Sequence, residues 1–227
     1  MALPPDVREP RDLAPLLEHT VLRPDATAED VRRACAEARA HGFAAVCVRP
    51  PLVRVAAAAL AGTRTPVVAV VDFPDGRGAT ADRVREAREA VAAGAGEIDV
   101  VLGREALRAR DHAAVHRDLA AVVAGCGVPV KVILVTCRLS HDEKVAACAL
   151  ARAAGAAWVK TSTGFAEGGA TPEDVALLRS VVGSAGGVKA SGGIRTAGDA
   201  LRMVRAGADR IGTSASVAVV AGTFAEP

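Results

Sequence analysis

The sequence has no tyrosine and few aromatic side chains of any kind, namely four phenylalanines and one tryptophan. So few aromatic side chains offer little for stacking bases. The formal net charge is only +2, which indicates no basic surface of the kind that nucleic-acid-binding proteins use. Its uninterrupted apolar runs are far shorter than the roughly 18 residues of a membrane span. The opening MALPPDVREP lacks the apolar stretch of a signal peptide. We therefore expect no nucleic-acid partner and no membrane partner.

Cysteine is also scarce, with five residues and no CxxC or Cys/His spacing. An odd, scattered set argues against a disulfide framework and against a zinc site. We expect reduced thiols in a cytoplasmic protein, with no metal and no other cofactor. Cys47 and Cys137, in or near strand ends, are interpreted as small buried residues.

Lysine is rare as well, because 24 of the 28 basic residues are arginine and only four are lysine. Lys144 lies in a helical pattern, whereas Lys131 (VKVIL), Lys160 (WVKTST) and Lys189 (VKASG) interrupt strand-like runs. Arginine stays protonated, whereas a lysine can become neutral and nucleophilic. The three lysines in strands are therefore candidates for chemistry.

Helical patterns alternate with short apolar runs along the whole chain. Helices are expected over 80–93, 142–154 and 172–183, and a first strand over 16–22. Seven further strands follow a helix-ending glycine or an opening proline or glycine, at Gly42, Pro66, Gly94, Pro129, Gly155, Gly187 and Gly207. Eight such units predict an α/β fold, a single (β/α)8 TIM barrel over 1–227 with an N-terminal extension at 1–12. A doubly wound open sheet is the alternative, and the lack of GxGxxG argues against it.

Lys160 and Lys189 hold equivalent places in successive strands, each directly after a valine. Barrel enzymes place catalysis where strands end, and adjacent strands lie about 5 Å apart. Repulsion and desolvation would both disfavour the protonated amine, which is how a lysine becomes a Schiff-base nucleophile. The alternative is a pair of lysines held in salt bridges or extending toward solvent.

Three carboxylate or amine side chains are expected near this pair. Asp99 interrupts the apolar run EIDVVL, points inward, and could balance a buried cation or relay protons. Glu18 in the first strand is either a supporting residue of the site or a rim or capping residue. Lys131, early in its strand, is expected to support the site from a lower layer.

Glycine clusters follow the last three strands. They comprise Gly164 with Gly168 and Gly169, Gly192 with Gly193, and Gly212 beside Thr213 and Ser214. A lone cluster of this kind is an ordinary strand-to-helix turn. Three after successive strands indicate a phosphate cradle of backbone N–H groups and hydroxyls, to which Arg195 could add charge.

Seven segments, spread over nearly the whole chain, together resemble a known family. They are LLEHTVLRPDAT (16–27), AAVCVRP (44–50), EIDVVLG (97–103), KVILVTCRLSHDEK (131–144), WVKTSTGF (158–165), VKASGGIRT (188–196) and RIGTSAS (210–216). In these segments the chain resembles the deoxyribose-phosphate aldolases. The resemblance implies a (β/α)8 barrel and a metal-free class I cleavage. The substrate would be 2-deoxy-D-ribose 5-phosphate, and the products glyceraldehyde 3-phosphate and acetaldehyde.

The same resemblance implies a role for each matching residue. Lys160 matches the Schiff-base lysine, Lys189 the second active-site lysine, and Asp99 an acid/base aspartate that works with a water. The phosphate-binding segments match Gly164, Gly192, Gly193, Gly212 and Ser214. The chain departs from the common pattern at Glu18, Arg23, Asp72, Asp75 and Ala215.

Two other functions fit the sequence less fully. One is a different Schiff-base aldolase or transaldolase on the same barrel. The other is a sugar-phosphate-binding protein without catalysis, which would keep the glycines without needing Lys160, Lys189 and Asp99 together. The expected partners are a small sugar phosphate and further copies of the chain in a homo-oligomer.

Overall fold

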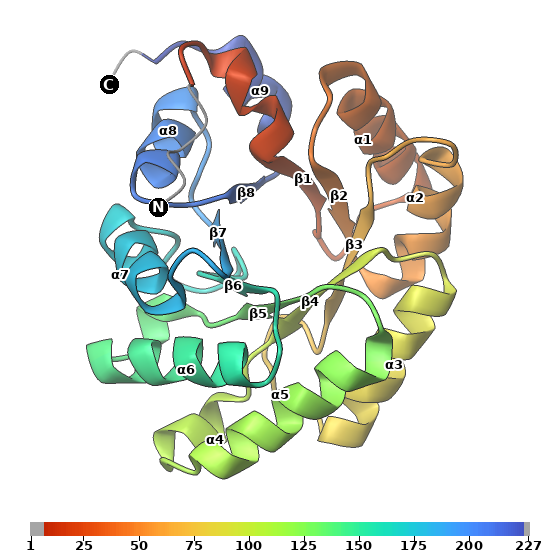
Figure 1. Ribbon diagram of the computed structural model, residues 1–227. Coiled ribbons are helices and arrows are strands. Elements are labelled where there is room, and N and C mark those ends of the chain that lie inside the picture. The colour runs from red at the N-terminus through yellow and green to blue at the C-terminus, as the bar shows by residue number, and fades with distance from the viewer. Residues whose placement is uncertain (1–6, 225–227) are drawn as a thin grey trace.

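Eight parallel strands close into a barrel in the computed structural model, which describes residues 7–224 (Figure 1). Each strand pairs with the next in the chain, and β1 pairs with β8 to complete the ring. The strands are β1 (Leu17–Val21), β2 (Ala45–Val48), β3 (Val67–Val71), β4 (Glu97–Val101), β5 (Val130–Ile133), β6 (Trp158–Lys160), β7 (Gly187–Ser191) and β8 (Arg210–Thr213). The predicted (β/α)8 barrel is confirmed, and the open-sheet alternative is wrong.

Helices connect successive strands and form an outer ring around the barrel (Figure 1). They are α1 (Ala28–His41), α2 (Val53–Ala59), α3 (Thr80–Ala92), α4 (Arg104–Arg108), α5 (His112–Cys126), α6 (His141–Ala153), α7 (Pro172–Val182), α8 (Ala197–Arg205) and α9 (Ser216–Ala221). Short 3₁₀ helices are η1 (Pro10–Leu16), η2 (Pro50–Leu52) and η3 (Thr136–Arg138). The three helices predicted by range begin and end within one residue of α3, α6 and α7.

The helix ends explain why the sequence pattern was readable. At the start of α1 the Thr27 side chain accepts a hydrogen bond from the Asp30 N–H, and the Asp30 carboxylate accepts one from the Thr27 N–H. Such a reciprocal pair satisfies donors that the first helical turn leaves free. α1 ends at Gly42, whose φ of 70° is left-handed and favours glycine. The chain then turns directly into β2.

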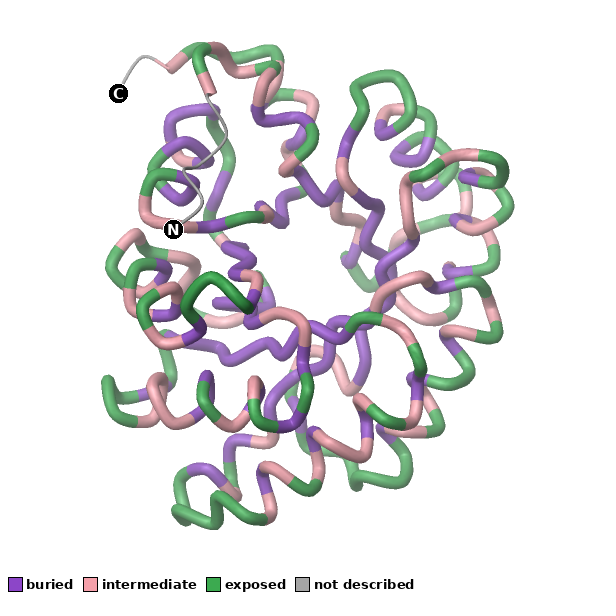
Figure 2. The backbone as a smooth tube through the Cα atoms, viewed as in Figure 1, coloured by how far each residue is buried: buried purple, intermediate pink, exposed green. Residues whose placement is uncertain are grey.

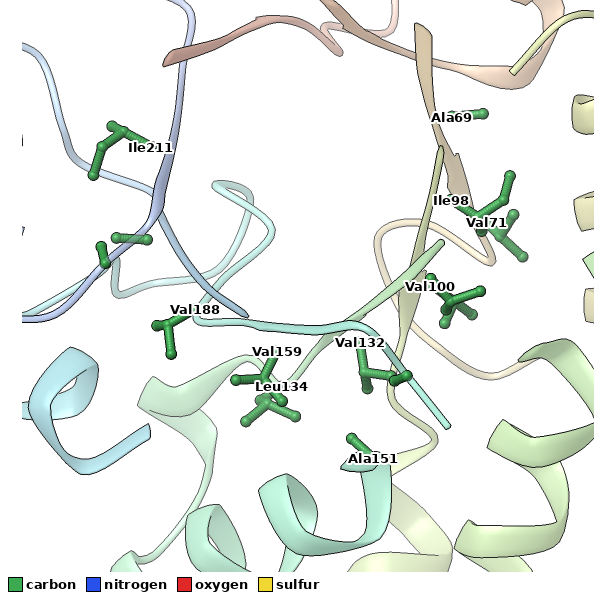
Figure 3. Close-up of a cluster of buried hydrophobic side chains, with 14 of the residues drawn as sticks. Ala69, Val71, Ile98, Val100, Val132, Leu134, Ala151, Val159, Val188 and Ile211 are labelled. Atoms are coloured by element: carbon green, nitrogen blue, oxygen red, sulfur yellow. The ribbon is translucent and has the colours of Figure 1, made fainter. Parts of the chain in front are cut away.

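The main core lies between the barrel and its helices. Figure 3 shows side chains that point outward from the strands, with Ala151 of α6 packed beneath them. The labelled strand residues are Ala69, Val71, Ile98, Val100, Val132, Val159, Val188 and Ile211, and the labelled Leu134 directly follows β5; all are buried. The strands are accordingly buried along their length, and exposed residues gather on the outer helices (Figure 2). Burying one such aliphatic side chain contributes about 1.5–3 kcal/mol.

The barrel interior has an apolar side and a polar side. Ala45, Cys47, Val68 and Val70 of β2 and β3 form an inner apolar cluster, against which Phe73 packs. Charged side chains of β1 and of β4 to β8 occupy much of the rest of the interior, and Val101 of β4 and Ile133 of β5 belong to a second, smaller apolar cluster. A buried cluster of charges therefore lies inside the barrel beside an apolar wall.

The N-terminal extension expected at 1–12 is described only in part, since residues 1–6 lie outside the described residues. Pro10–Leu16 forms η1, and its Leu13 and Ala14 are buried. The single-domain organisation over 1–227 stays a prediction. Within residues 7–224, no helix combines the length and the apolar character needed to cross a membrane.

Candidate active site

Lys160 and Lys189 lie side by side inside the barrel. They are partners in the register of β6 and β7, and they are 2% and 0% exposed. Both amines donate to the same oxygen, Oδ2 of Asp99, at 2.8 Å from Lys160 and 2.7 Å from Lys189. The expected inward orientation of all three side chains is confirmed, and the salt-bridge alternative is also correct as a description of the contacts. A shared carboxylate therefore holds two amines at one point.

The surroundings of the two amines differ, and so do their pKa values. Burial lowers the pKa of Lys160, Asp99 opposes that effect, and the charge of Lys189 adds to it. Burial also disfavours the charge of Lys189, but Asp99 and Glu18 outweigh it and raise the pKa of that amine. Because their pKa values move in opposite directions, Lys160 loses its proton more readily than Lys189 does.

Asp99 remains a carboxylate. Burial favours its neutral form, but Lys131, Lys160 and Lys189 together hold the pKa of Asp99 well below its usual range. Its Oδ1 lies 3.1 Å from the amine of Lys131. Asp99 is therefore in the charged form that accepts hydrogen bonds from the amines around it.

The two supporting residues lie deeper in the same cluster. Glu18 is fully buried and forms an ion pair with Lys189, so its interpretation as a rim or capping residue is wrong. Lys131 is fully buried and pairs with Glu97 as well as Asp99. The lower layer predicted for Lys131 thus supports Asp99 from below.

A cavity of about 800 Å³ opens above this cluster, and Lys160 lines it. The five residues predicted to bind phosphate also line it: Gly164, Gly192, Gly193, Gly212 and Ser214. Gly192 and Gly193 have successive positive φ angles of 91° and 79°. With such φ angles the backbone leaves the hydrogen-bonded pattern of the β-sheet. Backbone N–H groups in turns of this kind can bind anions. Arg195 lies at the same cavity.

A second segment holds this turn in place. The Ala170 N–H donates to the Gly192 carbonyl oxygen at 3.0 Å. A methyl group on Gly169 would lie only 2.3 Å from that oxygen, so the two backbones approach as closely as glycine permits. Of the glycines singled out at 168–169, Gly169 therefore packs against the Gly192 turn, whereas Gly168 packs against Cys137.

Sequence reasoning missed two residues at the floor of the barrel. Glu97 forms an ion pair with Lys131, and the Arg210 guanidinium lies 3.4 Å from Glu18. Glu97 is two residues before Asp99, so strand alternation could have placed it on the same face. Arg210 opens the last strand but is one of 24 arginines, and nothing in its type marked it.

The two cysteines near strand ends differ. Cys47 is fully buried, and burial raises the pKa of its thiol to about 11. Cys137 is exposed, so its interpretation as buried is wrong. It lies beyond the end of β5, in η3, where strand alternation no longer applies. Among the described residues, no group of three or more His, Cys, Asp or Glu side chains could hold a metal ion.

A (β/α)8 barrel with a buried lysine pair on one carboxylate, beneath a glycine-lined cavity, has the architecture of a Schiff-base aldolase. The family model of the DeoC/LacD family aldolases matches residues 14–222. The chain belongs to this family and is an aldolase, a carbon–carbon lyase.

Individual relatives agree with this assignment. A deoxyribose-phosphate aldolase of Brevibacillus brevis is 49% identical over 207 residues, which cover 91% of this chain and 94% of the relative. One of Thermotoga petrophila is 49% identical over 93% of this chain and 86% of the relative. The deoxyribose phosphate aldolase of Aeropyrum pernix, described as having a unique tetrameric structure, superposes with a TM-score of 0.86. It is 36% identical, and the match covers 94% of this chain and 91% of that one.

Proposed function

We propose that this chain cleaves 2-deoxy-D-ribose 5-phosphate reversibly to D-glyceraldehyde 3-phosphate and acetaldehyde, through a Schiff base on Lys160. One observation carries the proposal: of the two paired amines, the one that faces the cavity, Lys160, is the one whose pKa is lowered, chiefly by burial, while the pKa of Lys189 is raised. The relatives named above carry the same activity in their names. The roles of individual residues follow from the contacts.

Lys160 is the nucleophile in this proposal. Its unprotonated amine adds to the aldehyde carbon of the open-chain sugar, and loss of water leaves a protonated imine. Asp99 accepts a hydrogen bond from that nitrogen in the resting state, so it is placed to move protons while the imine forms, directly or through a water. Lys189 stays charged beside it and stabilises the carboxylate form of Asp99.

The imine then accepts the electron pair of the C2–C3 bond of the sugar as that bond breaks. A base removes the proton of the sugar's 3-hydroxyl group, a carbonyl forms at C3, and the C2–C3 electron pair moves toward the imine as an enamine. Glyceraldehyde 3-phosphate leaves at this point. Protonation of the enamine at C2 and hydrolysis then release acetaldehyde and restore Lys160. Asp99 is the carboxylate nearest to Lys160 and the residue we assign to these proton transfers.

The glycine-lined end of the cavity is proposed to bind the phosphate. Gly192 and Gly193 supply backbone N–H groups, and Gly164, Gly212 and Ser214 line the same space. Backbone N–H groups hold an oxyanion without the flexibility of long cationic side chains. This anchor fixes the sugar so that its other end reaches Lys160.

The apolar cluster of β2 and β3 does not itself line the cavity, but its closeness to Lys160 suits a substrate that lacks a 2-hydroxyl group. Cys47, Val68 and Val70 belong to the apolar inner cluster, and Cys47 is close enough to Lys160 and Asp99 for their charges to act on its thiol. A hydroxyl group against such a wall would lose its hydrogen bonds with water and gain none. The C2 carbon of a 2-deoxy sugar carries no hydroxyl group and so loses no hydrogen bond there.

A coupled assay tests the function directly. Purified protein is mixed with 2-deoxyribose 5-phosphate, and acetaldehyde release is followed with alcohol dehydrogenase and NADH. We expect release with this sugar and little cleavage of fructose phosphates under the same conditions. Preference for a fructose phosphate would favour the other Schiff-base aldolases. Calorimetric binding of deoxyribose phosphate without any acetaldehyde release would favour a binding protein.

The assembly and location of the chain are separate proposals. A homo-oligomer is supported by the relative from Aeropyrum pernix, which is described as tetrameric. Light scattering after size exclusion would give the mass of the assembly, and a mass near 23 kDa would contradict an oligomer. The cytoplasmic location stays a prediction of the sequence.

A further inference from the structure

The charged groups inside the barrel are unequal in number. The cations are Lys131, Lys160, Lys189 and Arg210, and the carboxylates that contact them are Glu18, Glu97 and Asp99. From β2 only Cys47 adds an ionisable group, a thiol whose raised pKa keeps it neutral, and the inner residues of β3 are valines. With every ionisable group charged, the cluster would hold one positive charge in excess.

Burial of most of these groups favours losing that excess charge. An uncompensated ion in a low-dielectric interior is costly, and the usual relief is the loss of a proton. Arginine cannot lose its proton in a protein, so relief must come from a lysine. Because Arg210 always keeps its positive charge, the excess can be removed only when one of the three lysines loses a proton.

The contacts determine which lysine loses its proton. Lys131 lies within ion-pair distance of three carboxylates, and Lys189 and Arg210 each lie near two. Within the described part of the chain, Lys160 contacts Asp99 alone and shares even that oxygen with Lys189. Lys160 is therefore the amine with the least carboxylate compensation.

Arg210 is fixed at the floor, away from the cavity. Its guanidinium lies 3.4 Å from Glu18 and 4.0 Å from Glu97, and its carbon centre lies 5.4 Å from the centroid of the Trp158 ring. Trp158 is two residues before Lys160 on β6, so the two side chains share a face of the strand. Arg210 does not line the cavity that Lys160 faces.

We propose that Arg210 is a positioning residue for the reaction. Its permanent positive charge pairs with Glu18 and Glu97, so these carboxylates cannot also compensate a charge on Lys160, and Lys160 is left as the unprotonated amine. The proposal rests on the Schiff base assigned to Lys160. It predicts that the protonation of Lys160 follows the net charge of the floor. Removing the cation should favour protonated Lys160, and removing a floor carboxylate should favour the neutral amine.

Three variants test the sign of this effect. Arg210→Met removes the cation and should move the acidic limb of the kcat/KM pH profile to higher pH. Glu97→Gln removes an anion and should move it to lower pH. The double variant again has one excess positive charge in the cluster. Its acidic limb should therefore lie close to that of the unchanged protein. Charges in such sites interact through an effective dielectric of about 20, so each single shift should be roughly 0.5–1 pH unit.

Controls separate charge from folding. Arg205→Met removes the same charge from an exposed position of α8 and should leave the profile unchanged. Arg210→Lys keeps a cation beside Glu18 and should keep most of the original profile. Thermal melts identify a variant that does not fold. If Arg210→Met is such a variant, Glu97→Gln alone should still move the acidic limb to lower pH, and the Arg205→Met control should still leave it unchanged.

Imine trapping distinguishes the two proposals. Acetaldehyde and borohydride are added across the same pH range, and peptide mass spectrometry measures the adduct on Lys160. An adduct on another lysine would refute the proposed nucleophile. An adduct on Lys160 whose pH dependence is the same in all folded variants, or shifts in one direction in both single variants, would refute the role of Arg210.

Discussion

Lys160 and Lys189 donate to one oxygen of Asp99, yet only Lys189 has a second carboxylate, Glu18. This difference separates two amines that the sequence presents as equivalent. The lysine with two carboxylates is stabilised as a cation. Lys160, whose carboxylate contact is only the shared one, faces the cavity and has a lowered pKa, as the proposed nucleophile requires.

Replacing Lys160 by arginine should abolish turnover. Arginine keeps the charge and nearly the length of lysine but cannot provide an unprotonated amine, so no imine forms. We expect acetaldehyde release to fall by at least about 10⁴-fold, to the background of the assay. The borohydride adduct should be absent from this variant and present on Lys160 of the unchanged protein. Residual turnover above a few per cent would contradict the assignment.

A charge placed in the glycine turn should weaken substrate binding. A Cβ atom at Gly193 would meet no atom within 4 Å, so a short side chain has room there. Gly193→Asp places a carboxylate at the proposed phosphate position and should raise KM at least about tenfold. Gly193→Asn is the matched control, because Asn and Asp tolerate the positive φ similarly. An equal KM for the two variants would place the phosphate elsewhere.

Removing divalent metals should not affect the reaction. In the proposed route the protonated imine on Lys160 is the electron sink, a task that a metal performs in other aldolases. Activity after thorough dialysis against EDTA should equal that before dialysis, and added zinc should not increase it. A loss that zinc restores would contradict a Schiff-base mechanism.

Much of the barrel could be predicted because its strands and helix ends obey local rules. Asp99 was identified as a charged residue inside an apolar run, and the shared place of Lys160 and Lys189 after a valine predicted their pairing. Glu18 could not be placed in this way, because its contact with Lys189 depends on β1 pairing with β8 when the ring closes. The functional roles of Lys160, Lys189 and Asp99, and of the glycines, stay predictions.

The floor of the barrel was not predictable for a related reason. Arg210 is marked by its position at the first residue of β8, not by its type, and the first residues of a strand are the hardest to assign. Its contacts with Glu18 and Glu97 join β8 to β1 and β4 across the interior. Only the closed ring brings these three charges together.

The two active-site lysines should have opposite effects on stability. The folded pKa of Lys160 is lowered, so at neutral pH keeping this amine in the fold has a cost, which falls as pH rises through its folded pKa toward the ordinary value of 10.5. The folded pKa of Lys189 is raised, so the contribution of this amine to stability is fully present below pH 10.5 and is lost as pH rises through the folded value.

Lys160→Met should therefore raise the free energy of unfolding at pH 7 by about 1 kcal/mol, as removal of strained catalytic groups often does. Lys189→Met should lower it by about 3 kcal/mol, because Glu18 and Asp99 lose a buried partner. Urea unfolding at equal protein concentration measures both, and a loss of equal size in the two variants would contradict the neutral state of Lys160.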